Sequence, residues 1–251
     1  MAVLFVADVH LDAGPAGRER MADFVAFLRR IDSSSVNRLV LLGDLFDFWF
    51  EYHHVIFSGY FEVLRAFAEL RDQGMAFDLL CGNHDFWAGR FLENELGFKI
   101  HRGAAKVELG GLNVLMMHGD GLNPRDWGYR AYKRIARARW AIALFRLLHP
   151  DRAMALARGV SRSSRRLTLP ADESASGETL ALRAFAKDAL AKGDADVVIL
   201  GHAHYPLREE HPTPKGTGLY INAGDWLSHH SYVLWDGEDF HLHVADEHSG
   251  A

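Results

Sequence analysis

The sequence predicts an α/β fold in which strands and helices alternate along the chain. The first observation is a series of short apolar runs that end in glycine or a polar residue, as buried strands do where they enter a loop. The run at residues 39–42, for example, leads directly into Gly43 and Asp44. The second observation is that segments with apolar residues at helical spacing separate these runs. Open α/β sheets bind ligands at the carboxyl ends of their strands, so the polar residues there are candidate functional residues.

Strands and helices alternate throughout the first half of the chain. Apolar runs predict strands at residues 2–7, 39–42 and 76–80. Apolar residues at helical spacing predict helices at residues 21–31 and from about 58 to 72. The second helix is expected to stop at Gly74, because glycine is a common signal at the end of a helix.

The second half of the chain changes character and adds hairpins. Two strands around residues 107–117 flank Gly110-Gly111, which indicates a β-hairpin. We expect a helix over residues 179–192 and a strand over residues 196–200. Residues 219–222 and a hairpin over 231–243, which turns at Asp236-Gly237, are expected to complete an antiparallel second sheet.

Between these halves, residues 123–170 have the pattern of a helical insertion, which we call the cap. One helix is expected to place Tyr129, Trp140 and Leu147 on a single face and to end at His149-Pro150. A second helical piece is expected at about 152–161. No internal repeat, low-complexity tract or linker divides the sequence. We therefore expect one domain over residues 1–251, with the cap as an insertion in it.

The composition is that of a globular protein. The chain has 251 residues, 49% hydrophobic and 24% charged, which is enough to bury a full core. Its one cysteine, Cys81, cannot form an internal disulfide, and this favours a reducing compartment. The N-terminus has the pattern of a strand and not of a signal peptide, and no run approaches the roughly 20 apolar residues of a membrane span. We therefore expect a soluble, cytoplasmic protein.

Charge is unevenly distributed along the chain. The net charge is −5, yet residues 125–166 contain 12 Lys and Arg against two acids, Asp126 and Asp151. This stretch of the cap therefore carries +10 and the rest of the chain −15. Such asymmetry favours an anionic partner such as a phosphate, a nucleic acid or an anionic lipid. The alternative is a helix face whose arginines are simply solvated.

Donors typical of metal sites follow five of the predicted strands. They are oxygen and imidazole donors without sulfur, a set that suits Mn²⁺, Zn²⁺ or Fe²⁺ better than Ca²⁺ or Mg²⁺. The donors number too many for one tetrahedral ion, whereas two ions that share Asp44 would use them all. Two-metal hydrolytic sites hold ions roughly 3.5–4 Å apart and lower the pKa of a bridging water toward neutrality. The donors are Asp8, His10, Asp44, Asp47, Asn83, His84, His118, His202 and His204.

The order of these motifs (Asp-X-His, Gly-Asp-X-X-Asp, Gly-Asn-His-Asp, His-Gly-Asp and Gly-His-X-His) resembles the calcineurin-like metallophosphoesterase family. The resemblance implies a four-layer α/β/β/α sandwich with two divalent metal ions. It implies that one ion is bound by Asp8, His10, Asp44 and His204. It implies that the other is bound by Asp44, Asn83, His118 and His202. His84 would stabilise the transition state or protonate the leaving oxygen, and Asp47 would orient His84 or a metal ligand.

A closer resemblance, to bacterial UDP-2,3-diacylglucosamine hydrolases, lies in residues 44–50, 118–122 and 221–226. These enzymes cleave a lipid A precursor into UMP and 2,3-diacylglucosamine 1-phosphate, typically with Mn²⁺, and carry a helical cap. Many members have Arg where this chain has His84. The resemblance implies substrate contacts from the residues of the cap that match the family's motifs: Asp126, Tyr129, Arg158, Ser161 and Arg165.

The predicted function is therefore hydrolysis of the pyrophosphate bond of UDP-2,3-diacylglucosamine, with the basic cap resting on the anionic inner membrane. Aromatic and aliphatic cap residues are candidates for an acyl pocket, or else they only pack on the core. One alternative is a general metal-dependent phosphodiesterase or nucleotide phosphatase. Another is a catalytically silent protein-binding scaffold, which should lack some ligands, and here none is missing. Nucleic acid is not expected as a partner, because the acidic remainder of the chain offers no long basic track.

Overall fold

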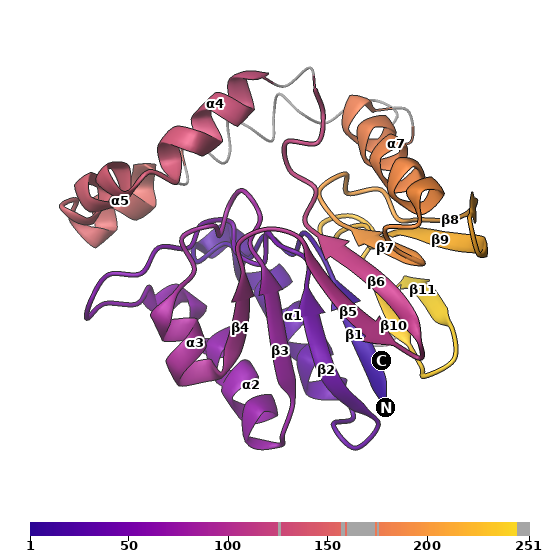
Figure 1. Cartoon of the computed structure of the whole chain (residues 1–251). Helices are drawn as coiled ribbons and strands as arrows, with labels where there is room; N and C mark the ends of the chain where they lie inside the picture. The colour runs from indigo at the N-terminus through magenta and orange to yellow at the C-terminus, as the bar shows by residue number, and fades with distance from the viewer. Residues whose placement is uncertain (125–126, 157–158, 160–173, 175, 245–251) are drawn as a thin grey trace.

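The computed structural model describes residues 1–124, 127–156, 159, 174 and 176–244. Two β-sheets lie against each other, with helices on their outer sides (Figure 1). The first sheet has the order β11-β10-β1-β2-β3-β4: Phe240–Val244, Ser231–Trp235, Ala2–Val6, Val36–Leu41, Ala76–Leu80 and Phe98–His101. The second has the order β5-β6-β7-β9-β8: Ala105–Leu109, Leu112–Met117, Val197–Leu200, Gly216–Asn222 and Leu207–Thr213. The core helices are α1 (Arg18–Arg30), α2 (Phe61–Asp72), α3 (Arg90–Leu96) and α7 (Gly177–Lys192).

Side-chain alternation in the strands builds the layers. In β1, Leu4 and Val6 pack in the core beneath α1 and α2, whereas Val3 and Phe5 pack in the core between the two sheets. A third core lies between the second sheet and α7 and includes Leu182, Ala186, Val198, Leu200 and Tyr220. Three cores separate four layers, so the predicted α/β/β/α sandwich is confirmed.

The prediction that the C-terminal hairpin completes the second sheet is wrong. β10 pairs antiparallel with β1, with Trp235 opposite Val3, and the hairpin therefore extends the first sheet. Its apolar side chains Val233, Trp235 and Phe240 pack in the core between the sheets. Alternation along a strand shows which face is buried but not which sheet edge accepts the strand, and this explains the error.

The sequence pattern also misses three short elements. α3 and β4 lie in a stretch of mixed polar and apolar residues, and β8 has the sequence Leu-Arg-Glu-Glu-His-Pro-Thr. β8 is an edge strand whose residues alternate between half-buried and exposed, so it lacks the apolar run that marks the central strands.

The first predicted cap helix, expected to end at His149-Pro150, is divided into two helices in the structure. α4 (Trp127–Ala136) and α5 (Arg139–Arg146) meet at Ala138, whose backbone is extended, and residues 150–156 are helical again. Both α4 and α5 lie above the edge of the sheets where the parallel strands end (Figure 1). Tyr129 points toward the core, while Trp140 is 64% exposed. Tyr129 and Trp140 therefore do not share the single helical face that was predicted for them.

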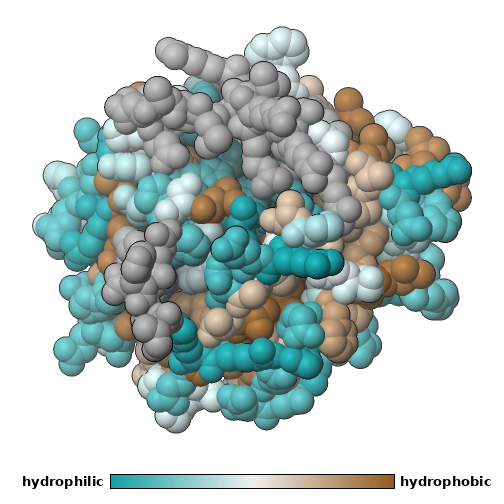
Figure 2. All heavy atoms as spheres, turned by 180° about the vertical axis from the view of Figure 1, so that it is seen from behind, coloured by the Kyte–Doolittle hydropathy of each residue, from teal (hydrophilic) through white to brown (hydrophobic). Residues whose placement is uncertain are grey.

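α5 presents apolar side chains on two sides. On the inner side, the Phe145 ring lies 4.8 Å from that of Phe50 and 4.7 Å from that of Trp87, measured between centroids. On the outer side, Leu144 is 62% exposed and Leu147, just beyond the helix, 82%. On the face seen in Figure 2, hydrophilic side chains predominate, with several groups of hydrophobic ones among them. The outer side of α5 is thus unusual for a surface helix.

Candidate metal centre

The loops that follow the parallel strands converge beneath the cap. The loops after β1 and β2 bond to each other through their backbones, with the N–H of Asp8 donating to Gly43 and the N–H of His10 donating to Asp44. These bonds prolong the parallel pairing of the two strands beyond their ends. They place the side chains of Asp8, His10 and Asp44 side by side at the edge of the sheet.

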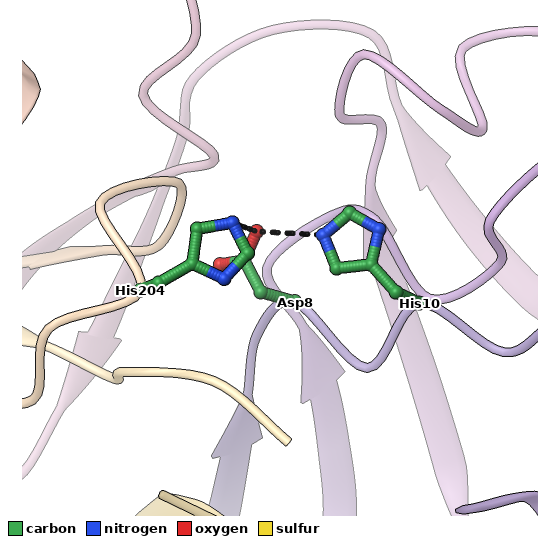
Figure 3. A group of neighbouring side chains, drawn as sticks. All are labelled: Asp8, His10 and His204. Carbon is green, nitrogen blue, oxygen red and sulfur yellow. Dashed lines mark ion pairs between the residues drawn. The ribbon is translucent and has the colours of Figure 1, made fainter. Parts of the chain in front are cut away.

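Two carboxylates occupy the middle of the cluster. Asp8 Oδ1 is 3.7 Å from His10 Nε2 and 3.8 Å from His204 Nε2. Figure 3 shows the Asp8 carboxylate between the two rings. Asp44 Oδ2 is 3.5 Å from His118 Nε2 and 3.8 Å from His10 Nε2. These separations exceed hydrogen-bond distance but suit donors that would surround a cation.

The backbone is strained at these residues. Non-glycine residues rarely adopt positive φ, because their Cβ then crowds the backbone. Here five of the predicted ligands do so: Asp8 (52°), His10 (48°), Asp44 (52°), His202 (66°) and His204 (59°). The tight turns that such angles allow direct the side chains toward the common centre.

Buried polar atoms without partners fit a divalent cation. Asp8 and His10 are 0% and 2% exposed, and Asp8 Oδ1 and both ring nitrogens of His10 have no hydrogen-bond partner within the described parts of the chain. Such atoms are costly unless something satisfies them. Three groups have one donor atom from each residue within 4.8 Å of the others: Asp8-His10-His204, Asp8-Asp44-His118 and His10-Asp44-His84. Their shared carboxylates fit two adjacent cations.

The electrostatics of the cluster favour added positive charge. Burial acts to lower the pKa of His118, but the Asp44 carboxylate outweighs this effect and the pKa is raised to about 10. Burial likewise acts against protonation of His10, yet Asp47 and Asp8 raise the pKa of His10 to about 9. The carboxylates thus hold protons on buried imidazoles when no metal is bound. A divalent cation would replace those protons.

Asn83 and His202 join the cluster through His118. Asn83 Oδ1 is 3.2 Å from His118 Nε2, and the rings of His118 and His202 are 4.9 Å apart between centroids. The backbone N–H of His202 donates to Asp8 Oδ2 at 2.7 Å, while His202 Nε2 is 3.6 Å from Glu178 Oε2. The seven predicted ligands, the two central carboxylates among them, therefore form one continuous cluster.

His84 lies at the rim of the cluster. Its Nδ1 is 2.8 Å from the backbone oxygen of Asp47, and its Nε2 is 3.9 Å from Asp44 Oδ2. A carbonyl only accepts, so Nδ1 must carry the proton and Nε2 faces the cluster. Nε2 can bind a metal ion or, when protonated, donate to a phosphoryl oxygen. The Asp47 carboxylate lies between the two rings, with Oδ1 3.6 Å from His10 Nδ1 and 3.9 Å from His84 Nδ1.

Only one of the predicted substrate contacts lies in the described part of the cap. The Tyr129 hydroxyl donates to Asp120 Oδ2 at 2.6 Å. The other four predicted contacts, Asp126, Arg158, Ser161 and Arg165, lie outside the described residues.

Two buried carboxylates that the sequence reasoning gave no role support the cluster. Asp225 Oδ2 is 3.1 Å from His204 Nδ1, and its Oδ1 accepts the backbone N–H of Ser228 and of His229, each at 3.0 Å. This contact would keep the proton of His204 on Nδ1 and leave Nε2 for a metal. The Asp85 carboxylate accepts backbone N–H groups from the loops that follow β2 and β3. Asp225 follows Gly224 and Asp85 follows His84, each within a motif described in the sequence. Those motifs were the signal from which the two carboxylates could have been found.

Comparison with known proteins gives consistent matches. Residues 1–206 match the calcineurin-like phosphoesterase family. A Porphyromonas gingivalis protein named UDP-2,3-diacylglucosamine hydrolase is 32% identical over 94% of this chain and 94% of its own. Proteins of the same name from Aeromonas salmonicida and Escherichia coli O6:H1 are 30% and 29% identical, over 93% and 96% of this chain and 89% and 98% of theirs. The solved structure of vacuolar protein sorting 29 from Cryptosporidium parvum covers 100% of this chain and 93% of its own, with 17% identity and a TM-score of 0.47.

Proposed function

Since the chain belongs to the calcineurin-like phosphoesterase family, in the branch of the UDP-2,3-diacylglucosamine hydrolases, we propose that it cleaves the pyrophosphate bond of UDP-2,3-diacylglucosamine. The products would be UMP and 2,3-diacylglucosamine 1-phosphate, an intermediate of lipid A synthesis. The observation that carries the proposal is the buried cluster of carboxylates and imidazoles beneath a basic cap, with partnerless atoms at its centre. A protein-binding scaffold would have no use for such atoms.

We assign the ligands of two divalent cations to this cluster. One ion would be held by Asp8, His10, Asp44 and His204, and the other by Asp44, Asn83, His118 and His202. When bound, the ions would supply an activated water and neutralise phosphate oxygens. We propose Mn²⁺, because mixed carboxylate, amide and imidazole donors suit it.

The chain itself would orient the substrate and move a proton. The Asp47 carbonyl fixes the ring of His84 so that Nε2 faces the reacting phosphate. In its protonated form His84 would donate from Nε2 to the leaving oxygen. The cap would close over the glucosamine phosphate with Asp126, Tyr129, Arg158, Ser161 and Arg165, and its inner aromatic residues offer an apolar wall for acyl chains.

We further propose that the outer side of α5 rests on an anionic bilayer. Trp140, Leu144 and Leu147 are exposed there, in a stretch that carries +10. Aromatic and aliphatic side chains next to arginines are typical of helices that lie in the membrane interface. Among the helices that the structure describes, none is long and apolar enough to cross a bilayer, so the contact would be peripheral.

The double variant Tyr129→Ala/Arg165→Ala tests the substrate. It removes two proposed sugar-phosphate contacts, so kcat/KM on UDP-2,3-diacylglucosamine should fall sharply. Activity on a small aryl phosphodiester, which would touch only the metal centre, should stay close to wild type. Equal losses on both substrates would make the cap purely structural. A wild-type enzyme that cleaves the diester but not the lipid would favour a general phosphodiesterase.

A further inference from the structure

Arg137 lies between the candidate metal centre and a large cavity beneath the cap. The cavity has a volume of about 1030 Å³ and is lined by residues that include Phe50, Phe86, Trp87, Arg137, Ile142 and Arg146. Arg137 Nη2 is 3.5 Å from the backbone oxygen of Gly82. Gly82 in turn packs directly on Asp44, because a Cβ at position 82 would lie 2.1 Å from Asp44 Oδ1. The guanidinium therefore contacts the loop that packs against the carboxylate shared by both proposed metal ions.

Arg137 directly follows α4, its backbone N–H donates to the Lys133 carbonyl, and its side chain and two from α4 approach the same carboxylate. Tyr129, Lys133 and Arg137 are four residues apart and so share a face of the α4 helical turns. Asp120 Oδ2 is 2.6 Å from the Tyr129 hydroxyl and 2.5 Å from Lys133 Nζ. Arg137 Nη2 is 3.9 Å from that oxygen, too far for a hydrogen bond. The Asp120 carboxylate therefore lies closer to the charge of Lys133 than to the charge of Arg137.

One N–H donor of the Arg137 guanidinium lacks an acceptor, although Nη2 makes a long contact with the Gly82 oxygen. Its Nε is buried and has no hydrogen-bond partner in the regions that the structure describes. Its Cζ lies 5.5 Å from the centroid of the Phe86 ring, a cation–π contact that does not use the N–H donors of the guanidinium. A buried donor without an acceptor is unfavourable, so a ligand is expected to supply one. Phosphate oxygens match the planar fork of a guanidinium.

We propose that Arg137 binds the leaving phosphate of a pyrophosphate substrate and so selects pyrophosphates over simple phosphodiesters; this assignment rests on the proposed function. In the hydrolysis, water adds to one phosphorus and the bond from that phosphorus to the bridging oxygen breaks. The electron pair stays on the bridging oxygen, which becomes part of the leaving phosphate, and one proton of the water ends there. Negative charge grows beside Arg137, whose guanidinium stabilises it.

The test compares Arg137→Ala and Arg137→Lys with Arg134→Ala, which removes the same charge from an exposed position of α4. Arg137→Ala should lower kcat/KM on UDP-2,3-diacylglucosamine by about 10²-fold, as when a transition-state donor is lost. It should leave kcat/KM on bis(p-nitrophenyl) phosphate unchanged, because that substrate has no second phosphate. Arg137→Lys should be intermediate, since it keeps the charge but loses the fork. Arg134→Ala should match wild type on both substrates.

Calorimetric titration gives a readout apart from turnover. Metal-loaded wild type should bind UDP more tightly than UMP, and Arg137→Ala should lose that preference while elemental analysis finds its metal content unchanged. Equal losses on both substrates, or a UDP preference that survives in Arg137→Ala, would overturn the assignment. If wild type does not cleave the lipid but its UDP preference depends on Arg137, the proposed function fails and the Arg137 site stands.

Discussion

Replacing Asp85 with alanine should destabilise the protein strongly. Asp85 is completely buried, and its carboxylate accepts the backbone N–H of Gly82 at 2.8 Å and of Leu45 at 2.9 Å. Leu45 follows Asp44 and Gly82 precedes Asn83, so these two bonds hold the loops after β2 and β3 together. Each buried N–H that loses its acceptor costs about 1–3 kcal/mol, so Asp85→Ala should lower the free energy of unfolding by about 2–6 kcal/mol.

The measurement is urea denaturation of metal-free protein at pH 5 and at pH 7.5. Burial and the nearby Asp44 carboxylate raise the pKa of Asp85 to about 7, above the value of about 3.9 for an unfolded chain. Between these two values the folded protein holds a proton that the unfolded chain has released. Asp85 therefore makes wild type less stable as pH rises through this window, by up to about 1.4 kcal/mol per unit. The difference in free energy of unfolding between wild type and Asp85→Ala should therefore be larger at pH 5 than at pH 7.5.

Asp236→Ala is the matched control. Asp236 also accepts two backbone N–H bonds, from Glu238 at 2.8 Å and Asp239 at 2.9 Å, but it is exposed and water can replace it. Asp236→Ala should lower the free energy of unfolding far less than Asp85→Ala does. Equal effects of the two variants, or a change below about 0.5 kcal/mol for Asp85→Ala, would refute the claim that burial sets the cost.

Three other changes test the metal centre and its surroundings. Asp44→Ala removes the ligand proposed to be shared, so metal content and hydrolysis should fall together; two fully occupied metals in that variant would exclude the bridge. His84→Ala should keep both metals while turnover drops roughly 10²–10⁴-fold, as for loss of a general acid or a transition-state donor. Metal loss in elemental analysis would instead make His84 a ligand. Burial raises the pKa of the Cys81 thiol to about 12, so its reaction with a thiol reagent in native protein should not accelerate between pH 7 and pH 9, as it would for an exposed cysteine.

The sequence predicts the elements whose pattern is local and misses those that depend on tertiary partners. β3 is observed at the predicted residues, 76–80, because its apolar run is buried on both faces. α7 begins two residues earlier than expected, at Gly177, since the Ser176 hydroxyl caps it by accepting the N–H of Thr179. The sheet that the C-terminal hairpin joins is decided instead by which edge is open, and no local pattern records that.

The candidate site likewise contains residues that the sequence predicts and residues that it misses. The predicted ligands could be found because each follows a strand and carries a donor atom. Arg137 could not be distinguished among 12 Lys and Arg in the basic stretch, because its role depends on the break after α4 and on the ring of Phe86. Asp120 belonged to a motif already noted, yet only the folded cap shows that it binds Tyr129 and Lys133.

The positive φ angles at the ligands have a consequence for selection experiments. A non-glycine residue in the left-handed region costs about 1 kcal/mol or more, so the five ligands together cost about 5 kcal/mol or more. That is comparable to the net stability of many whole domains, about 5–15 kcal/mol. The sequence that folds best without metal is thus not the sequence that catalyses. A library screened only for heat resistance in a chelating buffer would accumulate glycine at these positions, and its most robust survivors would be inert proteins.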